Sequence, residues 1–320
     1  RALLADVSTL AAPEFSGRLA GDAGYEAAAR WAARRFDRLG LDPAGDDATY
    51  LQRLPIECNV IEGTPSLAVT ANGEEHVAVL GVDFFCRGFT GRGQVDAPVA
   101  FVGYGLSAPD RGHDDYADVD VTGKVVLMFK PNPAWKPDSL GWEWADSTPR
   151  ARARTAREHG AVGVLWFTPP PADGGPTRGP IGSVLHGPGE HVADLPHLEV
   201  SVDVADRLLG DAGAARRLQA AIDSTRAPAS RPLAARAAIA VEAEYDPERE
   251  TCNVVAMLRG RDPELADQAL VIGAHLDHVG RQSPDVYFPG ANDNASGAAA
   301  VLRLAEAFTR VGVAPRRSVV

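Results

Sequence analysis

The stretch VIGAHLDHVG, residues 271–280, decides the fold that this sequence predicts. Val271 and Ile272 are typical of the end of a buried strand, yet His275, Asp277 and His278 follow directly. Residues i and i+2 of an extended segment face the same side, so Asp277 can accept the ring N–H of His275. The other ring nitrogen of His275 then remains available to bind a metal.

A second stretch, PGANDNASG at residues 289–297, supplies a further carboxylate. Asp293 lies in a turn of Gly, Asn and Ala that leads into a predicted helix. Its two oxygens suit the bridging of two cations about 3.5–4 Å apart. Ligands beyond the carboxyl ends of parallel strands also fit the usual place of sites in open α/β sheets. Together the two stretches predict a metal site with His275 and Asp293 as ligands and Asp277 as the group that orients the histidine.

Composition excludes several classes of function. The chain of 320 residues is long enough for two domains, and its net charge of −11 disfavours a nucleic-acid-binding surface. No apolar run approaches the ~20 residues of a membrane span. The clustered arginines are interpreted as a solvated helix face; they are Arg150, Arg152, Arg154 and Arg157. The three cysteines fit either one disulfide with one thiol left over or three buried thiols; they are Cys58, Cys86 and Cys252.

The pattern of apolar and polar residues changes twice along the chain. Residues 21–40 have the periodicity of an amphipathic helix, and from about residue 55 short alternating runs predict a β-rich region. Buried strands are expected at 97–105 and 123–130, followed by a helix and a strand within 151–167. A second break at 224–237 returns to strands, which include 268–275, and to a helix at 295–312.

Other motifs carry less weight. GYGLSA (103–108) fits a dinucleotide-binding fingerprint, but a loop follows where the fingerprint needs a helix. No serine lies in a G-x-S-x-G elbow. Three tryptophans are interpreted as loop packing; they are Trp135, Trp142 and Trp144. Three histidines are interpreted as solvent-facing; they are His186, His191 and His197. The β-rich region is therefore expected to shape substrate access and not to perform chemistry.

GAHLDHVG followed by PGANDNASG resembles the di-zinc aminopeptidase family, which includes bacterial leucyl aminopeptidases, glutamate carboxypeptidase and the transferrin receptor ectodomain. The resemblance implies that His275 binds one zinc, that Asp293 bridges two zincs and that Asp277 orients His275. Residues 10–43 resemble the opening helix of such enzymes. Segments 101–130, 156–167 and 195–209 resemble an inserted protease-associated domain.

The fold implied is α/β, a mixed and mainly parallel sheet flanked by helices, in which the C-terminal part of the zinc exopeptidase fold is missing. The predicted domains are an N-terminal helical part (1–55), the protease-associated domain (56–230) and the first part of the catalytic domain (231–320). The Glu-Glu pair and the later zinc ligands of the family match no position here. Residues 1–320 alone are therefore expected to hold zinc weakly and to hydrolyse no peptide.

The function implied is that of a zinc-dependent aminopeptidase, which removes N-terminal residues from peptide substrates through a water activated by two zinc ions. A carboxypeptidase or a glutaminyl cyclase of the same fold stays open, as does a non-catalytic receptor-like homologue. Relatives with this inserted domain suggest a secreted or cell-envelope protein. No nucleic-acid partner is expected.

Overall fold

The computed structural model describes residues 1–133, 135, 147–171, 179–180, 182, 191–312 and 315–320. These residues form two compact units. Unit 1 comprises Arg1–Cys58, Asp246–Arg281 and Tyr287–Val320, and unit 2 comprises Asn59–Tyr245 and Gln282–Val286. The boundaries at 58/59 and 245/246 fall inside two long strands, β2 (Leu51–Ala71) and β11 (Arg231–Val254).

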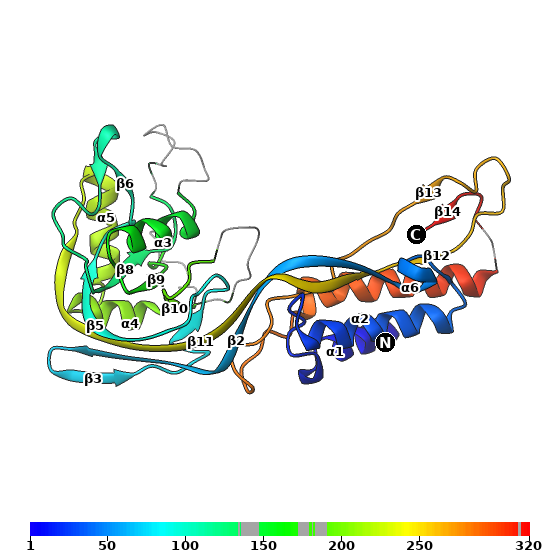
Figure 1. Ribbon diagram of the computed structural model, residues 1–320, viewed down its shortest axis with the longest axis horizontal. Coiled ribbons are helices and arrows are strands. Elements are labelled where there is room, and N and C mark those ends of the chain that lie inside the picture. The colour runs from blue at the N-terminus through cyan, green and yellow to red at the C-terminus, as the bar shows by residue number, and fades with distance from the viewer. Residues whose placement is uncertain (134, 136–146, 172–178, 181, 183–190, 313–314) are drawn as a thin grey trace. The chain divides into compact units, whose positions relative to one another are not determined.

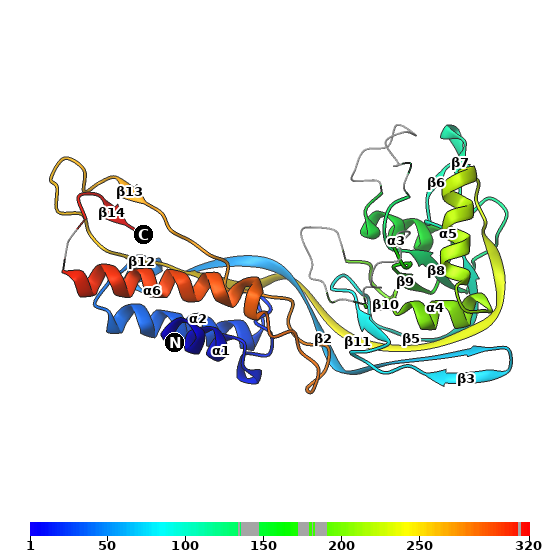
Figure 2. The same cartoon turned by 180° about the vertical axis from the view of Figure 1, so that it is seen from behind.

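Unit 1 is built on three α-helices, α1 (Ala2–Leu10), α2 (Ala23–Arg38) and α6 (Ser296–Val311). Both α1 and α2 contact α6, and the helices lie side by side in both views (Figures 1 and 2). Short elements complete the unit: η1 (Pro13–Phe15), β1 (Asp42–Pro43), η2 (Asp46–Ala48), β12 (Ala256–Met257), β13 (Ala269–Leu270), η6 (Ala291–Ala295) and β14 (Ser318–Val319). β1 pairs antiparallel with β12, and β13 pairs parallel with β14.

The helix predicted at 21–40 is confirmed as α2. Tyr25, Ala28, Ala32 and Phe36 recur at spacings of three and four and are buried. The chain leaves the helix at Gly40, whose φ of +71° is left-handed and easy for glycine. The buried face of α2 therefore anchors the first forty residues in the core of unit 1.

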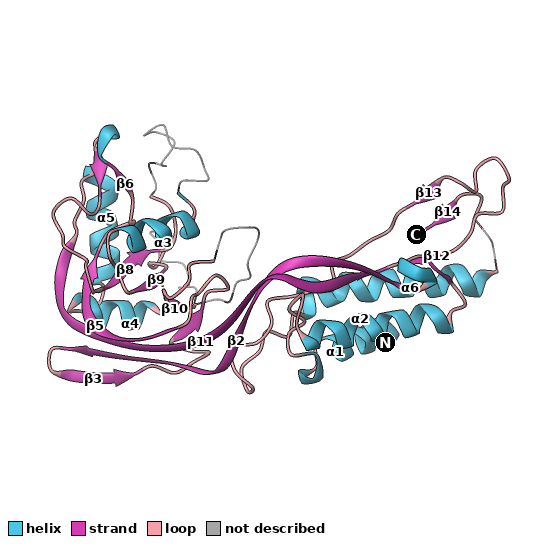
Figure 3. Cartoon of the chain, viewed as in Figure 1, coloured by secondary structure: helices cyan, strands magenta, loops and turns pink. Residues whose placement is uncertain are grey.

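Unit 2 contains the large sheet, whose strands in the described residues follow the order β3-β2-β11-β5-β8-β9-β10-β4. β5, β8, β9 and β10 run parallel, whereas β3 pairs antiparallel with β2, β11 with β5 and β4 with β10. The remaining strands are β3 (Glu74–Val77), β4 (Phe84–Cys86), β5 (Gly93–Phe101), β6 (Ser107–Ala108), β7 (His113–Asp114), β8 (Val125–Phe129), β9 (Gly163–Phe167) and β10 (His197–Val200). The helices are η3 (Pro109–Arg111), α3 (Pro149–Glu158), α4 (Val202–Leu209) and α5 (Ala214–Thr225). The α/β class is confirmed, with helices and strands interleaved along the chain (Figure 3).

The central parallel strands β8 and β9 are apolar throughout because helices cover both faces of the sheet. Along β8, alternate side chains point to opposite sides. Val125, Leu127 and Phe129 join the core that contains residues of α4 and α5. Val126 and Met128 join a second core with residues of α3. This double cover explains the runs VVLMF and GVLWF, in which every residue is buried.

Two expectations about the elements are corrected. β13 ends at Leu270, and Val271 is 72% exposed, so the predicted buried strand at 268–275 is wrong for the described structure. A buried parallel strand needs neighbours over both faces, and β13 pairs only with β14 among the described residues. Arg152 is not on a solvated helix face. It is buried and donates to the carbonyls of Tyr104, Phe129 and Lys130.

The three cysteines Cys58, Cys86 and Cys252 are free and buried, so the alternative without a disulfide holds. The loop expected after GYGLSA is also confirmed, since η3 and β7 follow β6 and no α-helix begins there. None of the helices in the described part of the chain is long and apolar enough to cross a membrane.

Candidate metal centre

The two motif segments meet at one end of unit 1. The first extends from β13, and the Ile272 N–H donates to the Val320 carbonyl over 2.8 Å, which continues the pairing with β14. The second is η6, which leads directly into α6. Residues 271–280 and 291–295 thereby approach one another although they come from different elements.

His275 lies between two carboxylates. Its Nδ1 is 3.3 Å from Asp277 Oδ1, and its Nε2 is 3.2 Å from Asp293 Oδ1. The side chains are open to solvent, at 54% for His275, 42% for Asp277 and 71% for Asp293. The sequence prediction that these three residues come together agrees with this geometry, in which each ring nitrogen faces its own carboxylate.

Asp293 is held by an irregular turn at the start of α6. Gly290 enters the turn with a left-handed φ of +59°, and Asp293 itself is non-helical at φ −113° and ψ +98°. The Ala295 N–H closes the turn on the Gly290 carbonyl, and the Gly297 N–H donates to Asn294 Oδ1 over 3.0 Å. The peptide bond between Asp293 and Asn294 is cis. A carboxylate at this end of a helix is favoured by the positive end of the helix dipole.

His278 and Arg18 complete the surroundings of the site. Burial lowers the pKa of the His278 imidazole, and the carboxylate of Asp293 opposes this shift. Burial likewise lowers the pKa of the Arg18 guanidinium, against the attraction of Asp277. Sequence reasoning missed Arg18, and the available signal was an arginine enclosed by glycines in SGRLAG at residues 16–21.

The donor set and its spacing fit a zinc ion. Zinc takes histidine nitrogen at about 2.0–2.1 Å and carboxylate oxygen at about 2.0–2.2 Å, which puts two tetrahedral ligand atoms roughly 3.3–3.5 Å apart. The separation of 3.2 Å between His275 Nε2 and Asp293 Oδ1 is close to that edge. Across the described residues, no group of three or more His, Cys, Asp or Glu side chains is placed to hold a metal. His275 and Asp293 are thus two side chains of the kind that binds zinc, with Asp277 at the opposite nitrogen of the imidazole.

An apolar groove of about 410 Å³ adjoins the metal-ligand pair within unit 1. Residues of α2, α6 and the segment 253–258 form its walls, and His275 and Asp277 are among its lining residues. The groove therefore places an apolar surface next to the polar site.

Among the described residues of unit 2, the histidines and tryptophans form no comparable site. His197 was expected to face solvent, and this is wrong, because it is fully buried in β10 and packs on Phe89 with ring centroids 5.1 Å apart. His191 stacks on Tyr245 at 4.1 Å. Trp135 packs on His113, as loop packing predicts. The remaining residues of these predictions, His186, Trp142 and Trp144, lie outside the described residues.

Comparison with known proteins identifies the segment that carries the site. Residues 253–320 match peptidase family M28, and the match includes His275, Asp277 and Asp293. The family expected from the two motifs is therefore confirmed.

Solved structures of several peptidases share the fold. The chain is similar to an aminopeptidase from Aneurinibacillus sp. strain AM-1, with a TM-score of 0.58 and 18% identity over 99% of this chain and 60% of that one. It is similar to a zinc aminopeptidase from Bacillus subtilis (TM-score 0.59, 16% identity, 99% of this chain and 59% of that one). It is also similar to a peptidase M28 precursor from Shewanella amazonensis SB2B, with a TM-score of 0.58 and 18% identity over 99% of this chain and 61% of that one. The chain spans about three fifths of the length of these proteins, and no curated protein matched it.

Proposed function

We propose that this M28 chain supplies the metal-binding part of a zinc-dependent exopeptidase that acts on the free amino terminus of peptides. The observation that carries the proposal is the imidazole of His275, which has Asp277 at one nitrogen and Asp293 at the other. Support also comes from the fold, since two of the similar structures are titled aminopeptidases.

Each of the three residues has its own proposed role, which follows from its position. His275 Nε2 and an oxygen of Asp293 would hold zinc, and the second oxygen of Asp293 would serve another zinc. The Asp277 carboxylate lies 3.3 Å from Nδ1, and the Asp277 backbone carbonyl is hydrogen-bonded to the same nitrogen at 3.3 Å. An N–H held on this side would fix the tautomer and the ring orientation of His275. Bound zinc would polarise the scissile carbonyl and lower the pKa of a water toward about 7.

The inserted unit has a separate proposed role. We infer that unit 2 is a protease-associated domain that shapes access for long substrates, because its described residues contain no metal-ligand cluster. We also infer export or cell-envelope location. One similar structure is titled a precursor, and fractionation of expressing cells would test this inference.

The decisive experiment assays the full-length protein on a leucyl chromogenic amide with a free or an acetylated amino group. We expect hydrolysis of the free form only, loss of turnover with a chelator, and recovery with zinc. Hydrolysis of an N-blocked dipeptide at its free carboxyl end would indicate a carboxypeptidase, and cyclisation of an N-terminal glutamine would indicate a glutaminyl cyclase. Zinc binding without turnover of any of these substrates would favour the receptor-like alternative.

A further inference from the structure

Arg18 lies beneath the metal-ligand pair and is a buried residue of unit 1. Its guanidinium donates Nε to the Leu276 carbonyl (2.8 Å), Nη1 to Pro289 (2.8 Å) and Nη2 to Gly290 (2.9 Å). Nη1 also donates to the carbonyl of Leu10. One side chain thus binds the last residue of α1 and both motif segments through their backbones.

The acceptors are placed where they control the ligands. Leu276 stands between His275 and Asp277, and Gly290 opens the turn that carries Asp293. A guanidinium is planar, and its donors have a fixed fork geometry, so carbonyls bound to it are held at set separations. The distance between the His275 segment and the Asp293 turn is therefore set through Arg18.

The backbone around Arg18 is shaped to reach this position. Ser16, Gly17 and Arg18 are all left-handed, with φ of +46°, +72° and +51°. Such conformations are unfavourable for residues other than glycine and persist where the surrounding structure enforces them. The Arg18 carbonyl accepts the His278 N–H (2.9 Å), and the Gly17 carbonyl accepts the Gly280 N–H (3.0 Å).

Close contacts leave no room for adjustment. A Cβ on Gly17 would lie 2.2 Å from the Gly280 carbonyl oxygen, and one on Gly290 would lie 2.6 Å from Arg18 Nη2. The loop at residues 16–18 and the two motif segments are therefore fitted to one another backbone to backbone.

We propose that Arg18 is a positioning residue that sets the separation of His275 and Asp293 and thereby the zinc affinity of the centre. The effect on zinc affinity rests on the proposed function. The hydrogen bonds by which Arg18 joins the two motif segments do not, because they form without metal.

The experiment compares Arg18→Met with Arg303→Met in the full-length protein. Arg303 is a matched control, because it also binds several partners in unit 1, namely Asp6, Glu306 and the Ala2 carbonyl, and it contacts neither motif segment. Hydrogen exchange of the metal-free proteins would be followed in peptides that cover 276–282 and 287–295. Zinc affinity would be measured by competition with a chelating dye.

Arg18→Met should speed exchange in both peptides by at least about tenfold and weaken zinc binding by about 10–100-fold, the usual loss when a group behind a ligand is removed. Arg303→Met should lower the thermal midpoint and leave both readouts at their wild-type values. Arg18→Lys, which keeps the charge and loses the fork, should give intermediate values and serves if Arg18→Met does not fold.

Equal exchange and equal zinc affinity in Arg18→Met and Arg303→Met would overturn the proposal, as would wild-type values in Arg18→Lys. If the wild-type protein bound no zinc, the proposed function would fail. The exchange comparison would still decide the role of Arg18.

Discussion

Asp293 and His275 contribute unequally to the proposed centre. One oxygen of Asp293 faces His275 and the other is free to serve a second ion, whereas His275 has only one nitrogen left for metal. Asp293→Ala should therefore remove both zinc ions from the full-length protein, and His275→Ala should remove mainly one. Metal analysis of the two purified variants checks this, and a loss of one equivalent in each would contradict a bridging role.

Asp277 is expected to act through His275. Asp277→Asn keeps the shape of the side chain but loses the charge that fixes the imidazole, so zinc affinity or turnover should fall by about 10–100-fold while most of the metal is retained. Asp285→Asn removes an exposed carboxylate eight positions away and is the matched control. Complete loss of metal in Asp277→Asn would make Asp277 a direct ligand, and an unchanged affinity would exclude a role.

The sequence predicted that His275, Asp277 and Asp293 lie together because their signals are local. His275 and Asp277 are two apart on an extended segment, and Asp293 lies in a recognisable turn before a helix. Arg18 could not be found in this way. Its hydrogen bond to Leu276 spans 258 positions, and no periodicity links residues so far apart.

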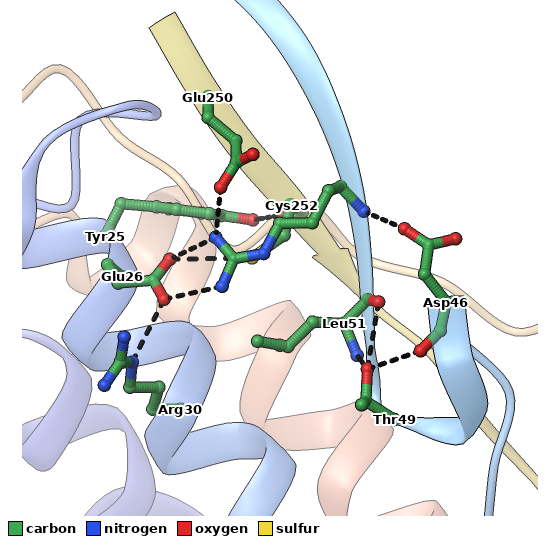
Figure 4. Close-up of polar contacts among 9 residues, drawn as sticks. Tyr25, Glu26, Arg30, Asp46, Thr49, Leu51, Glu250 and Cys252 are labelled. Carbon is green, nitrogen blue, oxygen red and sulfur yellow. Dashed lines mark hydrogen bonds and ion pairs between the residues drawn. The ribbon is translucent and has the colours of Figure 1, made fainter.

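At the scale of elements, an ionic network joins α2 to β2. Glu26 accepts hydrogen bonds from Arg30 (3.0 Å) and Arg53 (3.0 Å), and Arg53 also pairs with Glu250 (Figure 4). Burial raises the pKa of the Glu26 carboxyl, but the hydrogen bonds from Arg53 and Arg30 outweigh it and hold the pKa below the ordinary 4.5. The stability that Glu26 contributes is therefore present above pH 4.5 and is lost as the pH falls through the lowered pKa.

Glu26→Gln should lower the unfolding free energy of unit 1 by about 0.5–1 kcal/mol at pH 7, a modest value because the pair is partly exposed. At pH 3 the difference from wild type should shrink. Urea unfolding at both pH values measures it, with Glu264→Gln as an exposed control in the same unit. A deficit of equal size at both pH values would show that packing, and not charge, carries the effect.

His113 in β7 gives unit 2 the opposite pH dependence. Its imidazole is buried, with Nε2 3.4 Å from Asp115. Burial lowers the pKa of His113, but the nearby carboxylate of Asp115 outweighs it and raises the pKa above the ordinary 6.5. This stability is complete below pH 6.5 and is lost as the pH rises through the raised pKa.

His113→Gln should therefore destabilise unit 2 at pH 6 by about 1–3 kcal/mol, the cost of leaving a buried polar group without its partner. The deficit should be smaller at pH 9. Denaturant unfolding followed by Trp166 fluorescence would measure it, and equal deficits at both pH values would rule out the charged pair.

Strands were predictable where the sheet around them is complete. The runs of β8 and β9 are apolar on both sides, and helices cover both faces. The run LVI at 270–272 is equally apolar, but the sequence pattern does not show whether adjacent strands and covering helices surround it. Arg152 was misjudged for a related reason, because a helix face with arginines also suits buried guanidinium groups that bind backbone carbonyls.

At the scale of the whole molecule, the M28 match and the large sheet lie in different units. The M28 match covers 253–320, which lies in unit 1 except for Gln282–Val286, whereas the eight-stranded sheet of the described residues belongs mostly to unit 2. The sequence predicted both parts, with domain boundaries at 55/56 and 230/231, while the compact units divide at 58/59 and 245/246. Long strands hide such boundaries, because β11 continues as one strand from Arg231 to Val254 through the division at 245/246.

The ligand count gives the last prediction. Catalytic zinc normally has three protein ligands and a water, and the described residues bring only His275 and Asp293 to one place. Residues 1–320 expressed by themselves should therefore bind zinc weakly and hydrolyse no leucyl chromogenic amide. The assay adds zinc to the purified 320-residue chain with and without a chelator, and His275→Ala serves as the control for zinc bound elsewhere. Chelator-sensitive turnover that His275→Ala abolishes would contradict the prediction, because the general base and a third ligand would then have to lie within these residues.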